Sequence, residues 1–147
     1  RQQMYLRALR TIPNLEIIRG HFLSHTVWMP LANPSPGQNP YVEVIKTEEK
    51  GSDVNIATHL LYDGVKNAYG VAILISNDSD LVEPINIVKK DLHKAVIVLN
   101  PNLVYPSQEL KKSATFVKDI RQGVLAASQF PNTMQDKNGT FTKPASW

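Results

Sequence analysis

The chain has 147 residues with 42% hydrophobic and 20% charged residues and a formal net charge of +3, which indicates one globular domain and argues against global disorder. It has no cysteine, which excludes disulfides, thiolate catalysis and the usual structural zinc sites. No apolar run reaches the ~20 residues of a membrane span and no signal peptide is recognisable, so we expect a cytoplasmic protein.

The first residues predict a helix. Met4, Tyr5 and Leu9 recur near one face of the segment from Gln3 to Arg10. A parallel α/β domain normally begins with a strand that leads into such a helix. We therefore expect a strand to precede Arg1.

Two strands and a loop follow. Leu15 to Phe22 carries adjacent isoleucines and predicts a strand, and Tyr41 to Lys46 alternates apolar and polar residues as a second strand would. The segment from Trp28 to Tyr41 is rich in proline and predicts a long loop.

The next part of the chain alternates between helical and strand patterns. Apolar residues at helical spacing predict a helix from Val54 to Lys66, and a second helix is expected from about Asp80 to Leu92. The apolar runs from Val71 to Ser76 and from Ala95 to Leu99 predict buried strands, the first of them a central parallel strand covered on both faces. This alternation predicts a doubly wound α/β fold with a mainly parallel central sheet.

The C-terminal part predicts short elements. Ser107 to Ser113 and Arg121 to Ser128 are expected to be helical, and the residues from Ala114 to Asp119 remain undecided. The pair Asn138-Gly139 is suited to the turn of a small hairpin. We expect one domain over residues 1–130 and a C-terminal extension over residues 131–147.

Three aspartates carry the functional hypothesis. Asp53 lies at a predicted helix start, and Asp78 and Asp80 follow a predicted strand. Carboxylates are ligands that Mg2+ and Mn2+ prefer, and the carboxyl edge of a parallel sheet is where ligands collect. The alternative is that these acids only cap helices, with Ser52 or Asp53 as one cap and Asp80 paired with Glu83 in another.

Two linked motifs resemble those of the NYN family of PIN-like ribonucleases. They are Glu49-Lys50-Gly51-Ser52-Asp53-Val54-Asn55 and Ile75-Ser76-Asn77-Asp78-Ser79-Asp80-Leu81. The similarity extends from Arg1 to about Asn100, and Ser128-Gln129-Phe130-Pro131 is similar to a bacterial branch of the family. The resemblance implies a three-layer α/β/α PIN-like (Rossmann-like) fold and cleavage of RNA with Mg2+ or Mn2+. It gives Asp53, Asp78 and Asp80 the roles of catalytic metal ligands, with Ser76 and Asn77 shaping the turn.

RNA is therefore the expected partner. Lys46 and Lys50 would meet the RNA backbone near the acids, together with Ser76 and Asn77 of the turn. The simpler interpretation of the two lysines is solvated surface charge.

Several alternatives stay open. The same fold would also suit a non-catalytic RNA-binding or protein-interaction module, and homo-oligomer formation is open as well. The segment from Asp78 to Val82 also resembles the nucleophile motif of haloacid-dehalogenase-like phosphotransferases, but Asn100 stands after the next strand where that family has Ser or Thr. His21 and His25 have a spacing that would suit zinc on a helix, although their segment predicts a strand and a turn.

Overall fold

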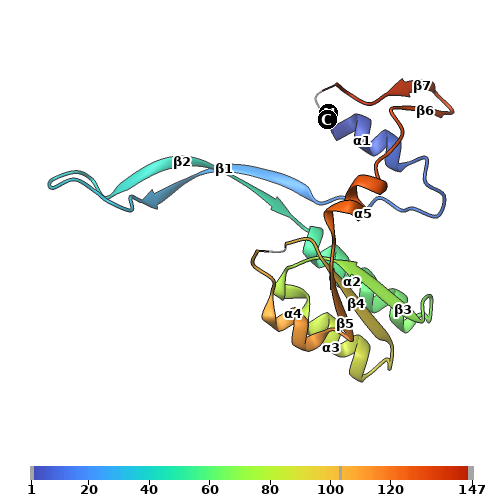
Figure 1. Ribbon diagram of the computed structural model, residues 1–147. Helices are drawn as coiled ribbons and strands as arrows, with labels where there is room; N and C mark the ends of the chain where they lie inside the picture. Colours follow the sequence, from blue (N-terminus) through green and yellow to red (C-terminus); the bar gives the residue numbers. More distant parts are fainter. Residues whose placement is uncertain (1, 103, 146–147) are drawn as a thin grey trace.

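The computed structural model describes residues 2–102 and 104–145. The elements along these residues are α1 (Gln2–Leu9), β1 (His21–Pro30), β2 (Tyr41–Lys50), α2 (Ser52–Val65), β3 (Val71–Ile75), the 3-10 helix η1 (Ser79–Leu81), α3 (Val82–Lys90), β4 (Ala95–Asn100), α4 (Gln108–Ser113), β5 (Phe116–Asp119), α5 (Gln122–Ala127), β6 (Thr133–Asp136) and β7 (Gly139–Thr142). Figure 1 shows them as a long β1–β2 hairpin, an α/β unit of β3 to β5 with α2 to α4, and a small unit of α1 with β6 and β7. A strand before Arg1 lies outside the described residues and stays a prediction.

The α/β unit confirms the predicted alternation of helices and strands. β3, β4 and β5 form a parallel sheet in that order, with Val71 of β3 opposite Ala95 of β4. η1 and α3 connect β3 to β4, and α4 connects β4 to β5. The segment left undecided by the sequence contains a strand, because Phe116–Asp119 pairs with β4.

The core lies on one face of this sheet. Ala72, Val96 and Val98 point to that face and are buried. Apolar side chains of the helices and η1 pack against them: Leu60, Leu81, Ile85, Val88 and Leu110. Burial of such side chains is the main favourable contribution to folding, so this face stabilises the unit.

The opposite face of the sheet is open. Val71, Ile73 and Ile75 of β3 are 52%, 61% and 65% exposed. β3 also lies at an edge of the sheet, so the prediction of a central strand covered on both faces is wrong. An apolar run has the same composition whether or not a second layer covers it, which is why the sequence could not distinguish the two cases. The described residues form two layers here, and the three-layer arrangement stays a prediction.

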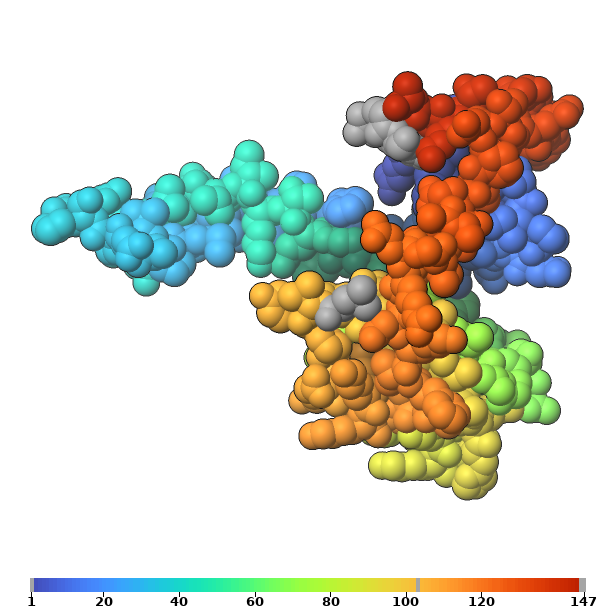
Figure 2. All heavy atoms as spheres, in the orientation of Figure 1, coloured from blue at the N-terminus to red at the C-terminus, as the bar shows by residue number. Residues whose placement is uncertain are grey.

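β1 and β2 form a long antiparallel hairpin. Their pairing runs from His21 opposite Lys50 to Pro30 opposite Tyr41. The strand predicted over residues 15–22 is therefore wrongly placed, and the second strand continues beyond its predicted end at Lys46. Cross-strand pairing sets these bounds, which composition alone did not reveal. In Figure 2 the hairpin projects from the rest of the molecule.

The predicted C-terminal hairpin is confirmed and is tied to α1. Arg7 donates hydrogen bonds to both carboxylate oxygens of Asp136, each at 2.7 Å, and a third to the Gly139 carbonyl at 3.0 Å. Its guanidinium also lies 4.3 Å from the ring centre of Phe141. This fork of hydrogen bonds joins residues that are far apart in the sequence.

Acid should loosen the contact between α1 and the β6–β7 hairpin. The Arg7 hydrogen bonds hold the pKa of Asp136 at about 2, below the value of about 3.9 for an unfolded aspartate. A lowered pKa in the folded state stabilises the protein above the unfolded-state pKa, and this contribution is lost as pH falls from about 4 to about 2. We expect the protection of the β6 and β7 amides against hydrogen exchange, relative to their intrinsic exchange rates, to fall over that range. An Asp136→Asn variant should lack this step, and an identical pH profile for both proteins would contradict the assignment.

The buried face of α3 should dominate stability. Val88 is 0% exposed, whereas Val65 at the end of α2 is 71% exposed. Val88→Ala should lower the free energy of unfolding by about 2–3 kcal/mol because it removes buried methyl groups and leaves a cavity. The matched Val65→Ala change should have an effect within about 0.5 kcal/mol. Urea unfolding would measure the free energy of unfolding of both variants. Equal losses of that free energy would show that the core does not lie on the Val88 face of α3.

Candidate acidic site

Asp53 lies in the first turn of α2, just beyond the end of β2. Gly51 turns the chain between them with a φ of +96°, which favours glycine because a Cβ would be strained there. Gly51 is also the N-cap residue, and no side chain caps the helix. Ser52 instead donates a hydrogen bond to Oε1 of Glu49 at 2.8 Å. Capping by Ser52 or Asp53 is therefore wrong, and Asp53 presents an exposed carboxylate.

Asp78 lies in the turn that follows β3. Its backbone N–H donates to Ser76 Oγ at 3.0 Å, and its own Oδ1 accepts from the N–H of Asp80 at 2.9 Å. Asp78 is the N-cap of η1, which confirms the capping interpretation for this residue. The proposed pairing of Asp80 with Glu83 in a capping box is wrong, because α3 begins after Leu81 without a side-chain cap.

The fold brings these acids within electrostatic range of one another. Although the Asp53 side chain is exposed, partial desolvation by the surrounding protein raises its pKa, and the negative charges of Asp78, Glu49 and Asp80 raise it further. Every charged group that contributes to this shift is a carboxylate. The start of α2, the end of β3 and the end of β2 therefore present acids to the same region, within electrostatic range of one another.

Sequence reasoning missed Glu49 as a member of this group. The predicted strand stopped at Lys46, whereas β2 continues to Lys50 and places Glu49 opposite Phe22. Gly20 makes room for the glutamate: a Cβ at this position would lie 1.8 Å from Glu49 Oε1 and 2.7 Å from the Lys50 carbonyl oxygen. The position of Glu49 four residues before Asp53 was the available signal.

The donor set fits a hard divalent cation in its chemistry. Carboxylate oxygens are the ligands that Mg2+ and Mn2+ prefer. Among residues 2–102 and 104–145, no three His, Asp or Glu side chains are grouped closely enough to hold an ion by themselves. Mg2+ commonly keeps several waters and uses only one or two carboxylates together with substrate phosphates, so this chemistry needs no closed protein cage.

The predicted RNA-contacting residues are engaged in protein contacts. Lys46 and Lys50 both form ion pairs with Glu48, at 2.7 and 3.4 Å. Ser76 accepts the hydrogen bond from Asp78 described above. Asn77 anchors the segment before α4, because its Nδ2 donates to the Tyr105 carbonyl at 2.8 Å and its Oδ1 accepts from the Ser107 N–H at 2.7 Å.

A groove runs beside α2 and begins at Ser52, the residue before Asp53. It has a volume of about 340 Å³ and extends from Ser52 past Asn55, His59 and Asp63 toward Leu74 of β3. Its size falls within the range of small-molecule sites, and its mainly apolar lining carries the polar side chains of Ser52, Asn55, His59 and Asp63 along α2. The groove is therefore a candidate surface for a substrate that reaches Asp53.

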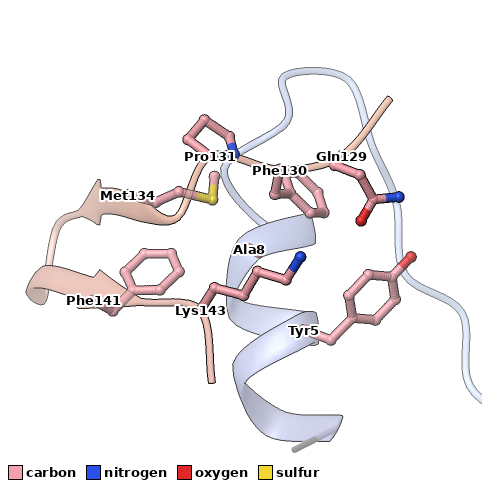
Figure 3. A pocket seen from close by; sticks show the side chains of 8 residues that line it. All are labelled: Tyr5, Ala8, Gln129, Phe130, Pro131, Met134, Phe141 and Lys143. Atoms are coloured by element: carbon pink, nitrogen blue, oxygen red, sulfur yellow. The ribbon is translucent and has the colours of Figure 1, made fainter. Parts of the chain in front are cut away.

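A second hollow lies between α1 and the β6–β7 hairpin. Figure 3 shows the side chains that line it: Tyr5, Ala8, Gln129, Phe130, Pro131, Met134, Phe141 and Lys143. Its volume of about 80 Å³ is far below that of a typical ligand site. It is a gap in the packing of this small unit rather than a candidate active site.

The family of the chain follows from comparison with known proteins. A family model described as the NYN domain matches residues 35–134. This range is more than half of the chain, and it includes Glu49, Asp53, Asp78 and Asp80. The chain belongs to the NYN domain family. NYN domains are typically nucleases of the ribonuclease type and typically use divalent metals. The match spans the second strand of the hairpin, the α/β unit and the start of the C-terminal hairpin.

One curated protein resembles this NYN domain over 157 aligned residues with 26% identity. It is named 6-hydroxy-3-succinoylpyridine 3-monooxygenase HspA and comes from Pseudomonas putida (strain DSM 28022 / S16). The alignment covers 99% of this chain and 50% of that protein, so the chain spans about half the length of its relative.

A solved structure shares the α/β fold of this domain. The crystal structure of VPA0982, a protein of unknown function from Vibrio parahaemolyticus RIMD 2210633, superposes with a TM-score of 0.54 and 19% identity. The superposition covers 82% of this NYN domain and 61% of that chain. In the described part of the NYN domain, no helix is long and apolar enough to cross a membrane.

Proposed function

We propose that this NYN domain is a divalent-metal-dependent endoribonuclease in which Asp53, Asp78 and Asp80 hold Mg2+ or Mn2+ together with waters and the phosphates of the bound RNA. The observation that carries the proposal is that the end of β2, the start of α2 and the turn after β3 bring Glu49, Asp53, Asp78 and Asp80 within electrostatic range of one another. Carboxylates that repel one another in this way gain stability when a cation binds between them. Family membership supports the choice of RNA as substrate.

The chain's own residues would divide the work of the reaction. Asp53, Asp78 and Asp80 supply oxygen ligands, and the hydrogen bond to Asp80 N–H fixes one oxygen of Asp78 in place. With a divalent cation held by these carboxylates, the site would supply Lewis-acid polarisation of the phosphodiester and a water of lowered pKa. Lys46 and Lys50 would attract the RNA backbone, and the groove along α2 would hold nucleotides next to the acids.

We also propose the organisation that the sequence predicted. It comprises a three-layer PIN-like domain that ends near residue 130, a C-terminal extension, and action on RNA in the cytoplasm.

The test is cleavage of labelled single-stranded RNA by the purified chain. We expect internal cuts with Mn2+ or Mg2+ and none in EDTA. Cleavage that persists unchanged in EDTA would overturn the role of the metal. RNA binding of equal affinity with and without metal, and without any cut, would instead favour the non-catalytic RNA-binding module.

The same preparation should be tested on the substrate for which the Pseudomonas relative is named, 6-hydroxy-3-succinoylpyridine. The relative is 26% identical to this chain, which is the reason for testing this compound. Turnover of that compound without RNA cleavage would replace the nuclease proposal.

A further inference from the structure

The β1–β2 hairpin, here called the arm, exposes large apolar side chains along its length. Phe22 is 70% exposed, Trp28 62% and Ile45 78%. An isolated two-stranded hairpin is only marginally stable in water, and contiguous exposed apolar surface marks an interaction site. The arm therefore needs a covering partner to be stable as an extended element.

One face of the arm combines this apolar surface with negative charge. The cross-strand pairing places Trp28 beside Glu43 and Phe22 beside Glu49 on the same face. This face also carries the following residues: Ser24, Thr26, Pro30, Tyr41, Ile45 and Thr47. It contains no lysine, arginine or histidine.

The open face of the β3–β5 sheet has matching properties. The parallel register places Ile73 beside Ile97 and Ile97 beside Phe116, which is 70% exposed. Lys118 stands on the same face, opposite Leu99. The strand residues of this face include no acid, so its only charge is positive.

We propose that the arm of one copy packs on the open sheet face of a second copy. Glu43 and Lys118 would pair across this contact, since each is exposed and neither has an ion-pair partner among the described residues. In its extended form the arm cannot pack on the open sheet face of its own copy, because it points away from the α/β unit (Figures 1 and 2).

The charge balance selects a second copy over RNA as the occupant of the arm. Residues 21–50 contain two lysines and three glutamates, a formal charge of −1. Since the whole chain has a net charge of +3, its other residues carry a charge of +4. On the apolar face of the arm a polyanion would be repelled by Glu43 and Glu49, whereas another copy of the chain offers that face a positive, apolar surface. Lys46 and Lys50 lie on the other face of the arm. Reciprocal exchange of arms makes two identical contacts and closes a two-fold symmetric dimer.

The test is the mass of the whole chain in solution, measured by light scattering after gel filtration and by sedimentation. We expect a dimer at micromolar concentration. Trp28→Glu on the arm and Ile73→Glu on the sheet face should each give monomers. A mixture of the two variants should form a heterodimer, because one intact arm still meets one intact face. These side chains are exposed, and unchanged circular dichroism would show that the variants fold.

A charge-reversal pair refines the test. Glu43→Lys and Lys118→Glu should each weaken the dimer by roughly tenfold, and the double variant should recover the affinity. A monomeric wild-type chain would overturn the proposal. A dimer that survives Ile73→Glu would also overturn it, because the arms would then pair with each other. RNA binding that depends on Trp28 in a monomeric protein would assign the arm to RNA instead.

Discussion

Asp78→Asn should lower the rate of metal-dependent RNA cleavage by at least about 100-fold, which corresponds to about 2.7 kcal/mol of lost transition-state stabilisation. The reason is the loss of one negative charge from the proposed metal site. In the wild type the Asp80 N–H donates to Asp78 Oδ1 at 2.9 Å. Asparagine keeps an Oδ1 that can accept this hydrogen bond and is itself a good N-cap residue. The variant should therefore fold with the wild-type stability.

Asp91→Asn is the matched control for this prediction. Asp91 is exposed at the end of α3, and the same removal of charge there should leave cleavage unchanged. Single-turnover rates at saturating Mn2+ would compare the three proteins. Equal rates for wild type and Asp78→Asn would show that the carboxylate has no catalytic role.

Gly20→Ala should cause a second large loss of cleavage, by roughly 100-fold, without touching any proposed ligand. Its Cβ would lie 2.7 Å from the Lys50 carbonyl oxygen and 2.9 Å from Ser52 Oγ. The Lys50 carbonyl is part of the backbone and cannot rotate away as a flexible side chain can. The backbone at the junction of β2 and α2 must therefore shift. A displacement of about 1 Å near reacting groups can reduce a rate by about 100-fold.

Gly70→Ala provides the comparison, because a Cβ at Gly70 would meet nothing within 4 Å. It should retain the wild-type cleavage rate. Cleavage rates and urea unfolding of both variants would separate a local displacement from general instability. A Gly20→Ala protein with normal cleavage would show that the junction does not position the acids.

The α/β unit could be predicted because its signals are local. The apolar run of Val71–Ile75 and the helical spacing in α2 each identify an element without reference to its neighbours. The acidic group was foreseeable for a related reason. Asp53 and Asp78 lie at element ends, and the order of strands and helices brings such ends to one edge of a sheet.

What the sequence did not reveal depends on contacts between distant residues. The arm is defined by pairs such as His21 with Lys50, which no local pattern encodes. The exposure of Ile73 depends on whether another layer is present, and its apolar character is the same in both cases. Glu49 was missed because its place in the site follows from the continuation of β2 and from the space left by Gly20.

Titration of the Asp53 carboxylate by carboxyl-carbon NMR tests most directly whether these acids act as one cation site. In the metal-free protein we expect a raised pKa for Asp53. Asp78→Asn should lower it by removing a neighbouring negative charge, and Mg2+ should lower it further in the wild type by favouring the ionised form. A residual elevation of the Asp53 pKa should persist in Asp78→Asn, since partial desolvation is the largest cause of the shift and Glu49 and Asp80 remain. An Asp53 pKa that is ordinary, and that neither Asp78→Asn nor Mg2+ changes, would contradict the account.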